Sequence, residues 1–135
     1  MEAPAVSSRP ANRQPIVLLV EDDDDTRFGL ARTLAGEGYL ALSAPTGHDA
    51  VGVVHGEAAP VDAVLLDVDL PDVSGVDLCA RLRELRPCLP VVVCSGCATE
   101  DEVARLLEMG VLCYIQKPVA PAELLATVGA ALRTW

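Results

Sequence analysis

Asp67 is the residue whose position in the 135-residue sequence most clearly points to chemistry, because it ends the apolar run of residues 63–66. A carboxylate beside such a run is costly to bury unless it is paired or bound to a metal. Glu21 and Asp22 follow a second apolar run, residues 16–20. Carboxylates that lie close together repel one another, and a hard divalent cation such as Mg²⁺ relieves that repulsion. The three acids therefore indicate a candidate cation site.

Ser95 and Lys117 follow two later apolar runs, residues 91–94 and residues 111–115. A lysine can neutralise one oxygen of a phosphoryl group, and a hydroxyl can donate a hydrogen bond to another. A carboxylate such as Asp67 can act as a nucleophile and form an acyl phosphate. Taken singly these residues have ordinary interpretations, such as a solvated helix start for the acids. Together they favour metal-assisted phosphoryl transfer.

The elements that must bring these residues together alternate along the chain. Five short, β-rich apolar runs are separated by stretches of helical length and period. This alternation predicts an α/β fold in which a doubly wound, five-stranded parallel sheet is flanked by five helices. In an open parallel sheet the strands end at one edge, where ligands bind. The expected strands are residues 16–20, 39–43, 63–66, 91–94 and 111–115.

The helical stretches predict which faces are buried. The first helix is expected to have Asp24 or Asp25 as its N-cap, and the fourth to begin after Thr99 and end at Gly110. Residues 46–57 show the weakest helical pattern. The expected inward residues are Phe28, Ala31, Leu34 and Ala35, then Leu78, Leu82 and Leu85, then Val103, Leu106 and Leu107, and finally Leu124, Val128 and Leu132.

The charge balance excludes several classes of partner. The chain has 10 Lys and Arg against 20 Asp and Glu, a net charge of −10. Such a balance argues against direct nucleic-acid binding and against docking to an anionic membrane. Eight of the acids fall at the expected edge of the sheet, so that much of the excess charge calls for a divalent cation. They are residues 21–25 together with Asp67, Asp69 and Asp72.

The chain is expected to form one domain. Residues 1–14, rich in Pro, Ser, Ala and Arg, predict a flexible tail, and residues 15–135 a single domain without an output domain of its own. The tail lacks the apolar segment of a signal peptide, and no apolar run approaches the ~20 residues needed for membrane insertion. Five cysteines, an odd number, favour a reduced and therefore cytoplasmic compartment.

Four segments together resemble the receiver domains of two-component response regulators. They are residues 17–23, 65–75, 90–96 and 110–118, and the resemblance extends over about residues 15 to 134. It implies a flavodoxin-like sheet with the strand order 2-1-3-4-5. It also implies a phosphorylation-controlled signalling switch rather than a turnover enzyme.

By this resemblance, Asp67 would accept a phosphoryl group from a histidine kinase or a histidine phosphotransfer protein. Mg²⁺, or Mn²⁺, would be held by the side chains of Glu21, Asp22 and Asp67 and by the backbone carbonyl of Asp69. The acidic side chain of Asp69 is an addition to this pattern, and it could alter the metal affinity or the lifetime of the acyl phosphate in either direction.

The resemblance also implies a switch. Ser95 would be the switch hydroxyl, Lys117 would contact the phosphate, and Tyr114 would be the aromatic residue that turns inward on activation. The peptide bond before Pro118 would be cis, and Val119 stands where the family often has Phe. Phosphorylation would change the face made by the fourth helix, fifth strand and fifth helix, and so alter binding of a downstream protein or a second copy of the chain.

Two alternative functions compete with this interpretation. A haloacid dehalogenase-type phosphatase would use Asp67 as nucleophile and Asp69 as general acid. That family's acidic pair follows its lysine, whereas Glu21 and Asp22 precede the nucleophile here, and Pro71 stands where Thr or Val is usual. The second alternative is a protein-binding module that is never phosphorylated, against which the complete set of acids, serine and lysine argues.

The remaining motifs give only weak support for other functions. A flavodoxin-like flavin carrier would need a Gly-rich or hydroxyl-rich loop after the first strand, and this loop is acidic. Cys94 and Cys97 have C-x-x-C spacing, but Cys94 lies in a predicted strand, which favours a buried apolar role over a redox motif. His48 and His55 have no zinc-ligand spacing with these cysteines and are expected to be ordinary surface or packing residues.

Overall fold

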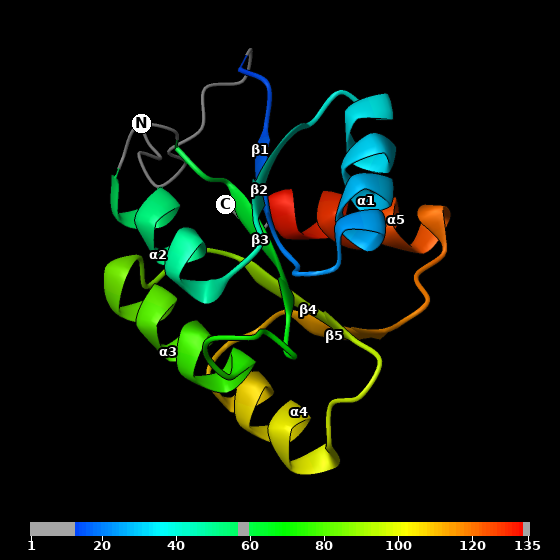
Figure 1. Cartoon of the computed structure of the whole chain (residues 1–135). Helices are drawn as coiled ribbons and strands as arrows, with labels where there is room; N and C mark the ends of the chain where they lie inside the picture. Colours follow the sequence, from blue (N-terminus) through cyan, green and yellow to red (C-terminus); the bar gives the residue numbers. More distant parts are fainter. Residues whose placement is uncertain (1–12, 57–59, 134–135) are drawn as a thin grey trace.

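The computed structural model describes residues 13–56 and 60–133, so most of the predicted tail lies outside the described residues. The five strands all run parallel in the order β2-β1-β3-β4-β5 (Figure 1), which confirms the predicted fold. Within the described ranges, no helix combines the length and apolar character needed to cross a membrane. The strands are β1 (Ile16–Val20), β2 (Leu40–Ala44), β3 (Ala63–Asp67), β4 (Val91–Ser95) and β5 (Cys113–Gln116).

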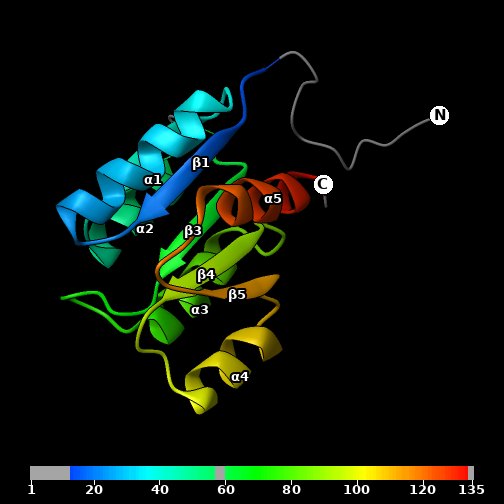
Figure 2. The ribbon, with the colours of Figure 1, turned by 90° about the vertical axis from the view of Figure 1, so that its right-hand side faces the viewer.

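Helices cover both faces of the sheet. One face carries α1 and α5, and the other carries α2, α3 and α4 (Figure 2). Every residue of β1, β3 and β4 is buried, as expected for inner strands of a parallel sheet. The helices are α1 (Asp24–Gly36), α2 (Gly47–Gly56), α3 (Gly75–Leu85), α4 (Glu100–Glu108) and α5 (Pro121–Leu132).

The predicted register of α1 is wrong in two respects. Its N-cap is Asp23 rather than Asp24 or Asp25, because Asp23 is extended and its side chain accepts the backbone N–H of Thr26 at 2.8 Å. The inward face is made by Arg27, Leu30, Ala31 and Leu34, whereas Phe28 is 58% exposed and Ala35 is exposed. The apolar pattern missed this face because its first member is an arginine.

The α4 region differs from its prediction at the end of the helix. Thr99 caps the helix and forms a capping box with Glu102. Leu106 is buried, but Leu107, predicted to face inward, is 49% exposed. Leu106 is therefore the buried residue through which α4 packs against the core. After Gly110, whose φ is +91°, the N–H of Val111 still bonds to Leu106. The next residue, Leu112, donates its N–H to the backbone carbonyl of Val91 in β4 at 2.9 Å, and β5 begins at Cys113, two residues later than predicted.

A close approach fixes the start of α3. A Cβ on Gly75 would lie 2.6 Å from the Cα of Val68, so this position accepts only glycine without a backbone shift. Ser74 caps the helix by accepting the N–H of Asp77 at 3.1 Å. The contact holds the segment after β3, which follows Asp67, tightly against the helix.

Candidate functional site

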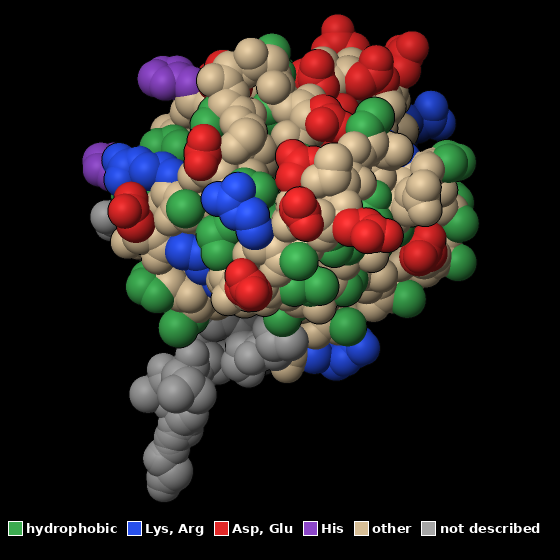
Figure 3. Space-filling view, turned by 90° about the horizontal axis from the view of Figure 1, so that it is seen from below, with side chains coloured by type: hydrophobic (Ala, Val, Ile, Leu, Met, Phe, Trp, Pro, Cys, Tyr) green, Lys and Arg blue, Asp and Glu red, His purple; other side chains and the backbone are tan. Residues whose placement is uncertain are grey.

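The sheet topology brings the predicted residues to one edge. Asp67 is the last residue of β3 and pairs with Cys94 of β4, while Ser95 ends β4 and pairs with Gln116 of β5. Glu21 directly follows β1, and Lys117 directly follows β5. Figure 3 views the molecule from below, the side toward which the strands run, and acidic side chains are prominent on this face.

Glu21, Asp22 and Asp67 form a group of possible metal ligands. One carboxylate oxygen from each lies within 4.8 Å of the others. Glu21 is 3% and Asp67 5% exposed, whereas Asp22 is exposed, so the group opens to solvent on one side. Three convergent carboxylate oxygens with an open side suit a hard cation that keeps some of its waters. The residues therefore fit Mg²⁺ or Mn²⁺.

Lys117 supplies the positive charge beside these acids. Its Nζ forms an ion pair with Glu21 and lies 3.4 Å from Oδ2 of Asp67. Burial opposes the charge of this lysine, but the hydrogen bond to Glu21 and the charges of Asp67 and Glu21 outweigh it, so that the pKa of Lys117 is raised. The amine is therefore a cation at neutral pH and faces Asp67, the carboxylate that the sequence predicts to be the nucleophile.

Asp67 sits in an environment that disfavours its charge. Burial raises the pKa of Asp67 to about 6, and the negative charge of Glu21 raises it further. The hydrogen bond from the N–H of Asp69 has the opposite effect and lowers this pKa. Lys117 compensates only in part. A carboxylate in this state gains from a further positive charge, which a divalent cation beside Glu21 and Asp22 would supply.

Arg27 is a site residue that the sequence reasoning missed. Its guanidinium, on a residue only 7% exposed, donates from Nη1 to the backbone carbonyl of Glu21 at 3.0 Å and from Nη2 to Asp24 at 2.6 Å. These bonds hold the acidic segment after β1 against α1. The available signal was the i, i+3 spacing of Asp24 and Arg27.

Ser95 is completely buried and makes several contacts. Its Oγ donates to Oδ2 of Asp69 at 3.0 Å and accepts the N–H of Cys97 at 3.2 Å. The hydroxyl of Tyr114, a half-buried residue, donates to the backbone carbonyl of Ser95 at 2.9 Å. The same carbonyl accepts the N–H of Lys117 at 3.1 Å, and the Lys117–Pro118 peptide bond is cis.

Several of the eight acids at this edge have structural partners instead of a place among the candidate metal ligands. Asp23 caps α1, and Asp24 pairs with Arg27. Asp72 accepts the N–H groups of Gly47 and His48, both at 2.9 Å, which caps α2 and lowers the pKa of Asp72. The expectation that much of the excess charge calls for a divalent cation is therefore too broad, because helix ends stabilise part of that charge.

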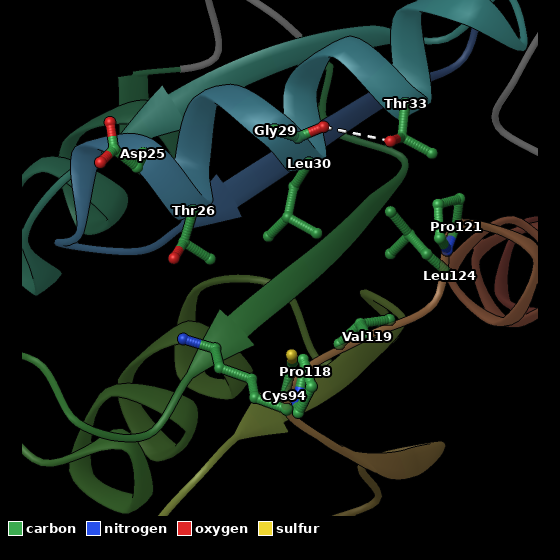
Figure 4. Close-up of a pocket in the computed structure, with 11 residues that line it drawn as sticks. Asp25, Thr26, Gly29, Leu30, Thr33, Cys94, Pro118, Val119, Pro121 and Leu124 are labelled. Atoms are coloured by element: carbon green, nitrogen blue, oxygen red, sulfur yellow. Dashed lines mark hydrogen bonds between the residues drawn. The ribbon is translucent and has the colours of Figure 1, made fainter.

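A pocket of about 530 Å³ adjoins the site between α1 and the segment that follows β5 (Figure 4). Leu30, Val119 and Leu124 give it apolar walls, and Thr26 and Thr33 contribute hydroxyls from α1. Lys117 also lines the pocket, so the site is bordered by apolar surface on this side.

The cysteines do not form a redox or zinc site. Cys94 is buried in the core cluster beneath α1 and α5, and burial raises the pKa of its thiol to about 11, whereas a redox-active thiol needs a lowered pKa. Cys97 is exposed, and both are free thiols. His48 and His55 are exposed on α2, and among residues 13–56 and 60–133 the group of possible metal ligands contains only acids.

Comparisons with known proteins agree with this geometry. A family model described as the response regulator receiver domain matches residues 17–129. Response regulator MprA of Mycolicibacterium vanbaalenii is 35% identical over 117 residues, 87% of this chain and 50% of the relative. The cell cycle transcriptional regulator CtrA of Caulobacter vibrioides is 32% identical, with coverage of 87% and 50%. The chain thus spans about half the length of the curated relatives it matches.

A solved structure agrees over nearly the whole fold. The crystal structure of a CheY-like response regulator receiver domain protein from Methanospirillum hungatei has a TM-score of 0.86 and 27% sequence identity. The similarity covers 90% of this chain and 96% of that one.

Proposed function

The chain belongs to the response regulator receiver domain family, and on that premise we propose that Asp67 is the residue at which this phosphorylation-controlled signalling switch is phosphorylated. One observation carries the proposal. Asp67 is a buried carboxylate at the end of β3, with Lys117 at 3.4 Å and two further carboxylates in reach of the same cation. This combination suits an oxygen nucleophile whose phosphorylated form must also be stabilised.

The reaction is a phosphoryl transfer from a phosphohistidine. An oxygen of Asp67 forms a bond to phosphorus while the phosphorus–nitrogen bond of the donor breaks. The electron pair leaves with the imidazole nitrogen, which can take up a proton. Lys117 neutralises charge on the transferred group, and the Ser95 hydroxyl donates to one of its oxygens after transfer. Each chain takes up one phosphoryl group, so the protein is a stoichiometric acceptor.

Mg²⁺ or Mn²⁺ would be held by Glu21, Asp22 and Asp67, with the backbone carbonyl of Asp69 as a further ligand. When bound, the cation supplies positive charge that offsets the carboxylates and the phosphoryl oxygens. The chain's own residues prepare this place. The N–H of Asp69 fixes Oδ1 of Asp67 at 3.1 Å, and the N–H of Asp23 fixes Oε2 of Glu21 at 3.1 Å.

The output is a change in the surface formed by α4, β5 and α5. Tyr114 lies on β5 and is bonded to Ser95, so a movement of Ser95 toward the phosphoryl group reaches this surface. The partners are a histidine kinase or histidine phosphotransfer protein as donor, and a downstream protein or a second copy of the chain as target. Five free thiols fit a cytoplasmic location.

The test is intact-mass measurement after incubation with acetyl phosphate and Mg²⁺. We expect a single phosphoryl adduct that is absent when Mg²⁺ is removed and absent in Asp67→Asn. The matched control is Asp25→Asn, which removes an exposed carboxylate beside the site and should leave the adduct unchanged. No adduct in the wild-type chain would refute the proposal and favour a binding module, while continuous phosphate release from p-nitrophenyl phosphate would favour the phosphatase.

A further inference from the structure

The side chain of Asp69 makes a contact that the proposed function does not use. Its Oδ2 accepts the hydroxyl proton of Ser95 at 3.0 Å. We propose that Asp69 is a positioning residue that holds the Ser95 hydroxyl in the unphosphorylated state and so opposes switching. We call this contact the Asp69–Ser95 latch. The inference rests on the proposed function, because it concerns the same hydroxyl that the phosphoryl group must recruit.

The latch follows from the hydrogen-bonding capacity of a serine. A hydroxyl carries one proton and can donate one hydrogen bond. The Ser95 hydroxyl gives that bond to Asp69, and the N–H of Cys97 occupies an acceptor position on the same oxygen. Ser95 is 0% exposed, so bulk water does not replace a lost partner. The hydroxyl therefore bonds either Asp69 or a phosphoryl oxygen, and the two states compete.

Asp69 is itself held in place by the residue that would be phosphorylated. Its backbone N–H donates to Oδ1 of Asp67 at 3.1 Å, and it forms an isolated β-bridge with Ser74, the N-cap of α3. Phosphorylation of Asp67 changes the acceptor for that N–H. It also places new negative charge near the Asp69 carboxylate. The repulsion between the phosphoryl group and this carboxylate disfavours their close approach.

Release of the latch is connected to the output surface. The backbone carbonyl of Ser95 accepts the hydroxyl of Tyr114, while its side chain is bonded to Asp69. Ser95 therefore links the acidic edge to β5 through one residue. In one state its hydroxyl is satisfied by Asp69, and in the other by the phosphoryl group, which is the arrangement of a two-state element.

The test measures the affinity for beryllofluoride, a phosphoryl analogue, by isothermal titration calorimetry with Mg²⁺ present. Asp69→Ala removes the competing acceptor and should tighten binding by about tenfold, the effect of a hydrogen bond to a charged group. Asp25→Ala removes an equal charge from the same edge and should change it by less than about twofold, since exposed charges interact weakly. Mg²⁺ affinity is measured separately for each variant.

A double-mutant cycle separates the latch from a general charge effect. In the Ser95→Ala background, Asp69→Ala should lose most of its effect, because no hydroxyl is left to release. Equal effects in both backgrounds, or no effect in the presence of Ser95, would overturn the latch. If the wild-type chain binds no beryllofluoride and takes no phosphoryl group from acetyl phosphate, the proposed function itself fails.

Discussion

Replacement of Asp67 by Asn should stabilise the metal-free protein at pH 8, although it removes the proposed phosphoacceptor. Burial raises the pKa of Asp67 to about 6 from an ordinary value of 3.8. Each pKa unit corresponds to about 1.4 kcal/mol, so ionising Asp67 in the folded state costs about 3 kcal/mol as an upper limit. Asn keeps the side-chain oxygen that accepts the N–H of Asp69 and carries no charge.

The pH dependence has a defined sign. Because the pKa of Asp67 is higher in the folded than in the unfolded chain, its contribution to stability is fully present below about pH 4. It is lost as the pH rises through about 6. The difference in free energy of unfolding between Asp67→Asn and wild type should therefore be small at pH 4 and reach its full value at pH 8.

The assay is urea unfolding followed by circular dichroism at pH 4 and pH 8, with EDTA or with Mg²⁺. Mg²⁺ should stabilise the wild type by about 2.7 kcal/mol at a hundred times its dissociation constant, and stabilise Asp67→Asn less, because one ligand has lost its charge. Asp25→Asn serves as the exposed control. An Asp67→Asn variant that is less stable than wild type at pH 8 in EDTA, or whose advantage is the same at both pH values, would refute the reasoning.

Four further outcomes follow from the surroundings of individual residues. Gly29→Ala should raise the free energy of unfolding by about 0.5–1 kcal/mol, because alanine favours the helix more than glycine does. A Cβ at this position of α1 would have no other atom within 4 Å. Gly75→Ala should instead lower the free energy of unfolding by about 2 kcal/mol or more, because its Cβ would clash with Val68. The stability of both variants is measured from urea unfolding midpoints. Similar effects at the two glycines would contradict the packing argument. Thr99→Ala should cost about 1 kcal/mol by removing the cap of α4, measured in the same way, and no loss would mean that the capping box contributes nothing. Lys117→Gln should tighten Mg²⁺ binding measured by calorimetry, because the ammonium group of Lys117 pairs with the carboxylates of Glu21 and Asp67 in the metal-free protein. Weaker binding would show that the lysine supports the cation site.

The fold and the ends of the strands were accessible to sequence reasoning because both depend on periodicity. A run of apolar residues that ends at Asp67 or Ser95 places that side chain at the edge of a parallel sheet, whatever the loops do. The grouping of Glu21, Asp22 and Asp67 follows from the same logic, whereas the strand order was implied by the resemblance to receiver domains and not by periodicity.

The remaining contacts depend on loop conformation and on side chains that break the apolar pattern. Arg27 occupies an inward position of α1 because its guanidinium reaches the carbonyl of Glu21, and apolar periodicity does not mark such a residue. The bond between Asp69 and Ser95 joins the segments after two strands, and its geometry depends on the backbone after Asp67. Asp72 shows the same limit, since its role as the cap of α2 spans 25 residues.

The bond between Tyr114 and Ser95 gives the protein a spectroscopic probe of its own. The chain has two tyrosines and one tryptophan, and Tyr39 is half-buried and packs with the core cluster on the α1 and α5 face, whereas Tyr114 packs with the cluster on the opposite face. With Trp135→Phe, the fluorescence would come from these two tyrosines alone, and the hydroxyl of Tyr114 is the one that is hydrogen-bonded to Ser95. The low aromatic content, which leaves the core aliphatic, thus makes unlabelled protein suitable for following the switch in real time.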